Sequence, residues 1–447
     1  MQRTSSLLDI STRQEKIARL AREAPERVLT TLAHHIDEEW LKEAYRRTRK
    51  DGAVGVDGVT ASAYETELEA NLKELLTRFK TGRYRAPAVR RVHIPKPGAG
   101  NQTRPIGIPT LEDKVLQRAV LMVLEPIYEQ DFLDCSYGFR PGRGAHRAIE
   151  VLWQQLSNIG GGWVIDLDIQ RFFDTVAWNH LRDFLDQRVR DGVIRRAIGK
   201  WLNAGVMEAG ELRYPEEGTP QGGVISPLLS NLYLHEVLDR WFEGVVKPRL
   251  KGRAFLVRYA DDAVLGFEWE DDARRVMAAL PKRFARYGLT LHEQKTRLID
   301  FRRPDRRRPP PDDHDGSSFN MLGFTHFWAR SRNGSWIIKR KTAKERFTRA
   351  LRRLWEWCRT YRHRPVAEQH LALSRKLRGH YAYYGITGNS AALSRFLWSA
   401  QRAWRYWLNT RSWKAQMPWA KFAPLLLRYP LPPARVVHSV YHRAANP

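Results

Sequence analysis

Apolar and polar residues follow different periods in successive parts of the chain. Residues 13–50 carry apolar positions at helical spacing among charged ones, which predicts one or two amphipathic helices. From residue 51 to about 144, short apolar runs separated by Gly and Pro favour strands, with one helix near residues 111–130. Between residues 163 and 336, strand-like and helical runs alternate, which indicates an α+β domain.

The pattern is helical throughout beyond residue 341. In residues 344–361, Phe347, Leu351, Leu354 and Cys358 share one helical face, and arginines occupy the others. Residues 302–316 are charged and rich in proline, so we expect an exposed loop there. The chain should therefore combine an α+β part with an all-α part.

Composition and charge indicate the kind of partner that the protein binds. The chain has 447 residues, of which 43% are hydrophobic, enough for packed cores in roughly two or three domains. Its formal net charge of +27 favours a polyanion such as nucleic acid over a neutral substrate. No apolar run is long enough for a membrane span, and no secretory signal is visible. Two cysteines supply neither a disulfide framework nor a four-thiolate zinc site, so we expect an intracellular protein.

Two adjacent aspartates interrupt an otherwise apolar hairpin. In FLVRYADDAVLGF, residues 255–267, Asp261 and Asp262 lie between two strand-like runs. Asp-Asp at a hairpin tip is also ordinary turn chemistry. Asp168 ends another apolar run, and three carboxylates on adjacent strand ends would repel one another unless a divalent cation lay among them. Such oxygen ligands suit Mg²⁺, and two ions about 4 Å apart can clamp both oxygens of a phosphoryl transfer.

Two glycine-containing segments are candidates for substrate binding. EGTPQGG, residues 217–223, is a loop that lets the backbone approach a ligand closely before a helix begins. In IPKPGAGNQTRPIGIP, residues 94–109, Lys96 and Arg104 flank a glycine turn and could bind a triphosphate as a point charge and a planar fork. A pair of solvated surface cations is the alternative interpretation.

The order of these segments resembles one family, the reverse transcriptases encoded by group II introns, also called maturases. The segments that look like its successive blocks are VGVDGVT, RRVHIPKPG, TRPIGIPT, SYGFRPGRGAHRAI, VIDLDIQRFFD, GTPQGGVISPLLSNLYL, RYADD, GLTLHEQKTRLIDF and FNMLGFTHFW. SRKLRGHYAYYGITGN resembles the maturase segment that follows them. One such block matches easily by chance, whereas many in the same order do not.

The resemblance implies a right-hand polymerase of the α+β class with an all-α thumb or maturase domain. Its parts would be an N-terminal helical extension over residues 1–50, fingers over 51–165, a palm over 166–340 and a helical thumb over 341–447. Two Mg²⁺ ions would be bound by Asp168, Asp261, Asp262 and the Ile169 carbonyl. The nucleotide pocket would contain Lys96, Arg104, Phe172, Gln221 and Lys295, the last near the leaving pyrophosphate.

Phe172 carries a separate implication of the resemblance. It lies four residues after Asp168, in a place similar to that where reverse transcriptases keep an aromatic ring beneath the sugar to exclude a ribose 2′-hydroxyl. The alternative is that Phe172 anchors the following helix in the core, as we expect for Phe173.

Arginines between aromatic residues mark the C-terminal part as a candidate RNA-binding surface. Arg402, Arg405 and Arg411 alternate with tryptophans, and cationic and aromatic groups side by side suit structured RNA. A solvated helix face is the alternative. Residues 34–37 and 312–315 contain possible metal ligands, but a helix face and a loop explain them more simply.

The resemblance implies an RNA-directed DNA polymerase that binds its intron RNA and assists splicing and mobility. Its partners would be intron RNA, an RNA template with a DNA primer, and dNTPs, in the bacterial cytoplasm or nucleoid and not at a membrane. The chain shows no His-Asn-His endonuclease with paired cysteines, which resembles shorter members of the family. A reverse transcriptase recruited to host defence and a splicing-only maturase remain alternatives, and the complete acidic set favours the polymerase.

Overall fold

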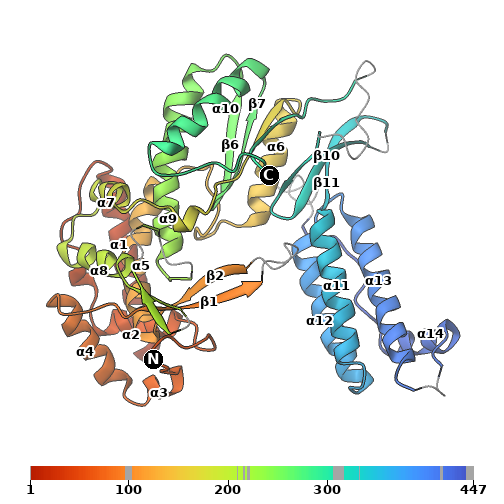
Figure 1. The fold of residues 1–447 in the computed structure, drawn as a ribbon, viewed down its shortest axis with the longest axis horizontal. Helices are drawn as coiled ribbons and strands as arrows, with labels where there is room; N and C mark the ends of the chain where they lie inside the picture. The colour runs from red at the N-terminus through yellow and green to blue at the C-terminus, as the bar shows by residue number, and fades with distance from the viewer. Residues whose placement is uncertain are drawn as a thin grey trace. The chain divides into compact units, whose positions relative to one another are not determined.

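The chain divides into two units, each assembled from separate stretches of sequence (Figure 1). The computed structural model describes residues 2–95, 103–208, 210–214, 217–218, 222–305, 317–331, 333–412 and 416–438. Within these ranges, unit 1 comprises residues 2–95, 103–144 and 165–298, and unit 2 comprises residues 145–164 and 299–438. No helix in the described ranges combines the length and apolar character needed to cross a bilayer.

Unit 1 begins with helices that pack against one largely buried helix, α5 (Leu111–Asp131). Thr110 caps α5 by accepting a hydrogen bond from the Asp113 amide at 3.2 Å. The Trp40 indole donates to the Ala119 carbonyl of α5 at 2.9 Å. The other N-terminal helices are α1 (Gln2–Glu23), α2 (Glu38–Arg47), α3 (Ala61–Glu65) and α4 (Leu68–Lys80), with a 3₁₀ turn at Ala33–His35. The helices expected over residues 13–50 and 111–130 are confirmed.

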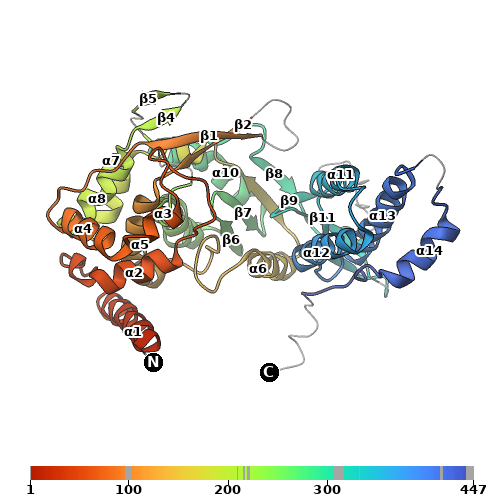
Figure 2. The same ribbon diagram turned by 90° about the horizontal axis from the view of Figure 1, so that it is seen from below.

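Two four-stranded sheets form the framework of the candidate site. The first has the order β2 (Thr103–Ile108), β1 (Val89–Pro95), β4 (Val206–Glu208) and β5 (Glu211–Arg213), and these strands lie side by side in Figure 2. The second has the order β6 (Ala254–Tyr259), β7 (Asp262–Phe267), β3 (Trp163–Leu167) and β8 (Arg297–Asp300). Tyr259 pairs with Asp262, so Ala260 and Asp261 form the predicted hairpin turn.

Helices between these strands complete unit 1. They are α7 (Trp178–Asp186), α8 (Gly192–Leu202), α9 (Ser226–Leu234) and α10 (Glu270–Ala285). α9 continues through π-helical turns at His235–Asp239 and Phe242–Val246 to a 3₁₀ turn at Lys247–Arg249. α10 packs along β7, whose residues from Ala263 onward are buried. The alternation of strands and helices predicted from residue 163 is thereby confirmed.

Unit 2 combines a small sheet with a helical part. Its sheet has the order β11 (Trp336–Thr342), β10 (Phe324–Arg330) and β9 (Phe319–Met321). Its helices are α6 (Ala145–Asn158), α11 (Lys344–Thr360), α12 (Val366–Tyr384), α13 (Ser390–Asn409) and α14 (Trp419–Arg428). The Trp153 indole of α6 donates to the Ile338 carbonyl of β11 at 3.0 Å, which ties an early helix to a late sheet. This unit is therefore not purely helical, and its two stretches are distant in sequence.

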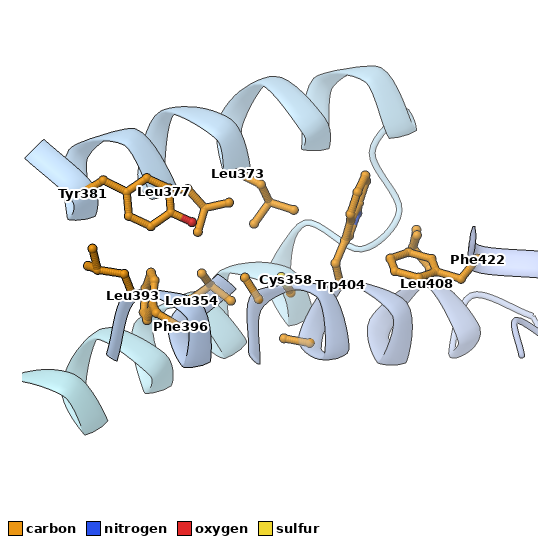
Figure 3. Packing of buried hydrophobic residues seen from close by; sticks show 12 residues of the cluster. Leu354, Cys358, Leu373, Leu377, Tyr381, Leu393, Phe396, Trp404, Leu408 and Phe422 are labelled. Carbon is orange, nitrogen blue, oxygen red and sulfur yellow. The ribbon is translucent and has the colours of Figure 1, made fainter. Parts of the chain in front are cut away.

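The helices of unit 2 enclose an apolar core (Figure 3). Leu354 and Cys358 of α11 are buried in it, and Phe347 and Leu351 pack against it, so the predicted apolar face is confirmed. Trp404 is fully buried and its indole donates to Gln369 Oε1 at 2.9 Å. Of the loop expected at 302–316, residues 306–316 lie outside the described residues. The four-part domain division stays a prediction.

Candidate active site

The hairpin turn between β6 and β7 has an unusual backbone. Ala260 adopts φ of 55°, the left-handed region that costs a non-glycine residue about 1–2 kcal/mol. Asp261 follows it, and Asp262 begins β7 with an exposed side chain. Such a conformation persists only where neighbouring groups hold it.

A buried arginine holds this turn. Arg258 is fully buried, and all five N–H groups of its guanidinium find acceptors. The acceptors are the Asp239 carboxylate at 2.7 and 2.6 Å, Asn231 Oδ1 at 3.0 Å, Ser136 Oγ at 2.8 Å and the Ala260 carbonyl at 3.0 Å. The last bond fixes the peptide that directly precedes Asp261. The "RY" before the acidic pair is the signal that could have revealed this residue, since a charge inside an apolar strand requires a partner.

Asp168 is positioned by the segment that precedes β8. Its carbonyl accepts hydrogen bonds from the His292 amide at 2.9 Å and from Thr296 Oγ1 at 3.2 Å, and Ile169 bridges to Leu291. Lys295 Nζ lies 3.4 Å from Asp168 Oδ2. The predicted pyrophosphate-side lysine is thus an ion-pair partner of a predicted metal ligand.

Burial and nearby charges act on the pKa of the Asp261 carboxyl in opposite directions. Burial raises the pKa of the Asp261 carboxyl, the Asp168 charge raises it further, and the Arg104 and Arg258 charges oppose these effects. Within the described ranges, no three Asp, Glu, His or Cys side chains lie close enough to hold one ion. The charges of Asp168, Arg104 and Arg258 thus all act on Asp261, and Asp262 is the next residue in the chain.

The nucleotide-pocket residues are only partly within the described chain. Lys96 and Gln221 lie outside the described residues. Arg104 is exposed on β2, paired in register with Ile94 of β1. Gly222 has φ of 111°, and a Cβ there would lie 2.4 Å from the Gly107 carbonyl of β2, so the glycine-rich segment packs directly on this strand.

Gln117 is a supporting residue that the sequence did not reveal. Its Oε1 accepts hydrogen bonds from the Val224 amide at 2.8 Å and the Ile225 amide at 3.4 Å. It thereby anchors the chain just after the glycine-rich segment. The side chain comes from α5, more than a hundred positions earlier, so no local pattern could indicate the contact.

Phe172 lies in the core. It is 2% exposed in a 3₁₀ turn, Phe172–Asp174, with its ring 5.4 Å from that of Phe173 and 6.4 Å from that of Tyr233. Phe173 is the more accessible of the two rings. This geometry favours the alternative interpretation of Phe172 as a packing residue, and its role beneath the sugar stays a prediction.

The three predicted RNA-binding arginines differ in their surroundings. Arg405 donates to the Met417 carbonyl at 2.9 Å, and Arg411 donates to the carbonyls of Arg362 and Arg364. Both therefore brace connections between helices. Arg402 is exposed, and its guanidinium lies 4.5 Å from the ring centre of Trp398.

Exposed aromatic rings extend from Arg402 across two helices. Trp355 of α11 lies 5.1 Å from Tyr406 of α13, ring centre to ring centre. Trp355, Trp398 and Tyr406 are 41%, 54% and 45% exposed. We call Trp355, Trp398, Arg402 and Tyr406 the aromatic–arginine surface. The i, i+4 spacing of residues 398, 402 and 406 is the sequence signal for it.

Comparisons with known proteins converge on one family. The family model described as reverse transcriptase (RNA-dependent DNA polymerase) matches residues 94–326. Protein YkfC of Escherichia coli (strain K12) is 39% identical over 290 residues, which cover 57% of this chain and 75% of the relative. The group II intron-encoded protein LtrA of Lactococcus lactis is 33% identical over 228 residues, 51% of this chain and 37% of LtrA. The mitochondrial nuclear intron maturase 2 of Arabidopsis thaliana is 31% identical over 177 residues, 30% of this chain and 24% of the relative.

Proposed function

Because the chain belongs to the reverse transcriptase (RNA-dependent DNA polymerase) family, we propose that Asp168 and the turn from Tyr259 to Asp262 form its polymerase active site. The sequence-based interpretation as a group II intron-encoded reverse transcriptase and maturase is confirmed by these relatives. Members of this family act on nucleic acids and use divalent metal ions. The chain spans only 37% of LtrA, so the specific activity and partners are part of the proposal.

The candidate ligands fit Mg²⁺ in chemical kind. Asp168, Asp261 and Asp262 offer only carboxylate oxygens, and Lys295 already compensates one of these charges at 3.4 Å. We propose two Mg²⁺ ions here, with the Ile169 carbonyl as a further ligand. When bound, the ions would activate the primer 3′-hydroxyl and neutralise charge on the triphosphate.

The protein's own groups position the reactants. Arg104, whose charge acts on Asp261, would bind the triphosphate, with Lys96 and Gln221 as further proposed contacts. The primer 3′-hydroxyl attacks the α-phosphorus, and pyrophosphate leaves. Lys295 is the candidate proton donor to that leaving group. Catalysis then consists mainly of positioning and charge neutralisation.

The right-hand arrangement is also proposed. In this assignment β1 and β2 belong to the fingers, the sheet β6-β7-β3-β8 to the palm, and α11 to α14 to a thumb or maturase domain. Template RNA, a DNA primer and dNTPs are the substrates. Two buried free thiols and nucleic-acid partners fit a location in the bacterial cytoplasm or nucleoid.

Intron RNA is the proposed ligand of the aromatic–arginine surface. Its three exposed rings offer stacking faces for unpaired bases, and Arg402 offers a phosphate contact. The relatives are named as intron-encoded proteins and maturases, which favours an intron-encoded reverse transcriptase over a role in host defence or in splicing alone. The retained acidic residues separate this chain from a binding-only protein.

The observation that supports the polymerase proposal is the Arg258-held turn that carries Asp261, together with the effect of the Asp168 charge on the Asp261 carboxyl. Purified protein should extend a DNA primer on an RNA template with dNTPs and Mg²⁺. Asp261→Asn, which keeps the side-chain shape, should lower the rate at least 100-fold, by analogy with loss of a key charge-stabilising group. Asp271→Asn, an exposed aspartate on α10, is the matched control and should extend normally. Normal extension by Asp261→Asn would refute the assignment.

A further inference from the structure

One large apolar side chain next to the catalytic turn lies outside the core. Residues 135–138 and residue 140 are buried, yet Phe139 between them is 57% exposed. Its φ is 56°, in the left-handed region that a bulky non-glycine residue rarely adopts. An exposed ring on a strained backbone is unfavourable in isolation, and residues held in this way cluster at sites that bind ligands.

The loop around Phe139 is rigidly anchored. The buried Arg140 guanidinium donates to Glu129 at 3.0 Å and to the carbonyls of Leu133 at 2.7 Å and Ser136 at 2.9 Å. Asn231 Nδ2 donates to the Gly138 carbonyl at 2.7 Å. The peptide before Phe139 and the side chain of the residue after it are therefore anchored, and the exposed position of the Phe139 ring is a property of the fold.

The same loop is packed against the catalytic turn. The Tyr137 amide donates to the Arg258 carbonyl at 2.9 Å, and the Arg258 amide donates to the Cys135 carbonyl at 2.7 Å. A Cβ on Gly138 would lie 2.3 Å from the Ala260 amide nitrogen, so only glycine allows this approach. The Phe139 ring lies 6.5 Å from the Tyr259 ring, centre to centre. The Phe139 ring thus lies near the ring of Tyr259, which is two residues before Asp261.

We propose that Phe139 and Tyr259 form an aromatic platform that contacts the 3′-terminal nucleotide of the primer. The inference rests on the proposed function and adds a substrate contact to it. In the proposed function, Asp261 would bind a divalent ion that the primer 3′-hydroxyl must reach. The terminal nucleotide of the primer would therefore lie beside this turn. The incoming triphosphate lies toward Arg104 on β2. Aromatic faces bind bases and sugars of any sequence, which suits a primer end that changes at every step.

The test compares three variants with the wild-type protein. Phe139→Ala removes the ring, Phe139→Tyr keeps it, and Trp269→Ala removes an equally exposed ring, 57%, beyond the opposite end of the hairpin. Affinity is measured by fluorescence anisotropy with an RNA template carrying a DNA primer, in the absence of dNTPs. The KM for dNTP is measured separately by primer extension.

Phe139→Ala should bind primer–template about tenfold more weakly, which corresponds to about 1.4 kcal/mol, because a stacked face is lost. Its KM for dNTP and its melting temperature should stay near those of the wild-type protein. Phe139→Tyr should restore most of the affinity, and Trp269→Ala should behave as wild type. Binding of intron RNA should be unaffected in all three variants.

Three results would overturn the inference. They are unchanged affinity in Phe139→Ala, a raised KM for dNTP with unchanged primer affinity, and a fall in melting temperature that accompanies the loss of binding. The first removes the contact, the second assigns the ring to the incoming nucleotide, and the third makes it a packing residue. Failure of the wild-type protein to extend any primer would instead remove the proposed function itself.

Discussion

Arginine serves opposite purposes in two regions of this molecule. Beneath the turn between β6 and β7, Arg258 is fully buried and all five of its N–H groups donate to protein acceptors. On α13, Arg402 is exposed and lies against an exposed tryptophan ring. Burial of a guanidinium costs free energy unless it is paired and hydrogen-bonded, whereas an exposed one remains available to phosphate. The net charge of +27 therefore does not indicate which arginines bind nucleic acid.

Arg405 and Arg411 occupy a position between these extremes. Each donates to backbone carbonyls within unit 2 while remaining partly accessible. Their hydrogen bonds reach carbonyls 12 and 49 positions away, whereas Arg258 donates to a buried carboxylate. An arginine whose N–H groups donate to protein acceptors stabilises the fold, whereas an exposed arginine can bind a ligand.

Removal of Arg258 should have the largest effect on stability. Arg258→Leu leaves the Asp239 carboxylate buried without its cation, so the free energy of unfolding should fall by about 3–5 kcal/mol. Urea denaturation measures this change. The double variant Arg258→Leu, Asp239→Leu should be less destabilised than the single one, because no unpaired charge remains. A double variant that is less stable than Arg258→Leu would contradict this account of the pair.

Asp113 gives the contrasting case, a buried carboxyl whose side-chain hydrogen bond comes from a neutral donor, the Tyr84 hydroxyl. Burial raises the pKa of Asp113 to about 7, and the hydrogen bond from the Tyr84 hydroxyl opposes this rise. The stabilising contribution of the protonated carboxyl is complete below about pH 4 and is lost as pH rises toward 7. Asp113→Asn mimics the protonated form, so it should remove a decline on the order of 3 kcal/mol between these pH values. Identical pH profiles of unfolding free energy for both proteins would exclude this effect.

The close approach of the 135–140 loop to the turn should tolerate no added methyl group. Gly138→Ala places a Cβ 2.3 Å from the Ala260 nitrogen, so stability should fall by about 1–3 kcal/mol, and primer extension should fall with it. Gly144→Ala in the next part of the same segment meets no atom within 4 Å and should change stability by less than about 0.5 kcal/mol. Equal behaviour of the two variants in thermal unfolding would argue against a tight contact.

Arg402 and Arg411 should separate binding from stability. Arg402→Gln should leave the free energy of unfolding within about 0.5 kcal/mol of the wild-type value. It should weaken intron RNA binding and reduce the slope of log affinity against log salt concentration by about 1, as expected for the loss of one phosphate contact. Arg411→Gln should lower stability by about 1 kcal/mol because the two hydrogen bonds of its guanidinium are lost, while both carbonyls keep Gln369 Nε2 as a donor. Titrations with intron RNA at two salt concentrations measure affinity and its salt dependence, and thermal unfolding measures stability. The reverse pattern would exchange the roles of the two arginines.

Local pattern was sufficient to predict the elements and the acidic pair. The continuously buried apolar runs of β6 and β7, the helical faces of α11 and the turn at Ala260 and Asp261 all follow from the local residue pattern. These features depend on neighbours within a few positions. The same holds for the i, i+4 spacing of Trp398, Arg402 and Tyr406.

Contacts between distant segments could not be predicted in this way. Gln117 meets the backbone near Val224, and Arg258 meets Ser136, across separations of 107 and 122 positions. Phe172 and Phe173 are adjacent, so periodicity could not decide which ring turns inward. The left-handed Arg171 directly before them, with φ of 48°, reorients the chain, and no sequence rule requires that conformation of an arginine.

The central claim is that the Arg258-held turn and Asp168 share a divalent ion. Iron(II) in place of Mg²⁺, with peroxide and ascorbate, generates hydroxyl radicals that cut the protein backbone close to the bound ion. The account predicts cuts near residues 166–170 and 259–262 in the wild-type protein, competed by Mg²⁺ and abolished in Asp261→Asn. Cuts that map elsewhere, or that persist unchanged in Asp261→Asn, would contradict it.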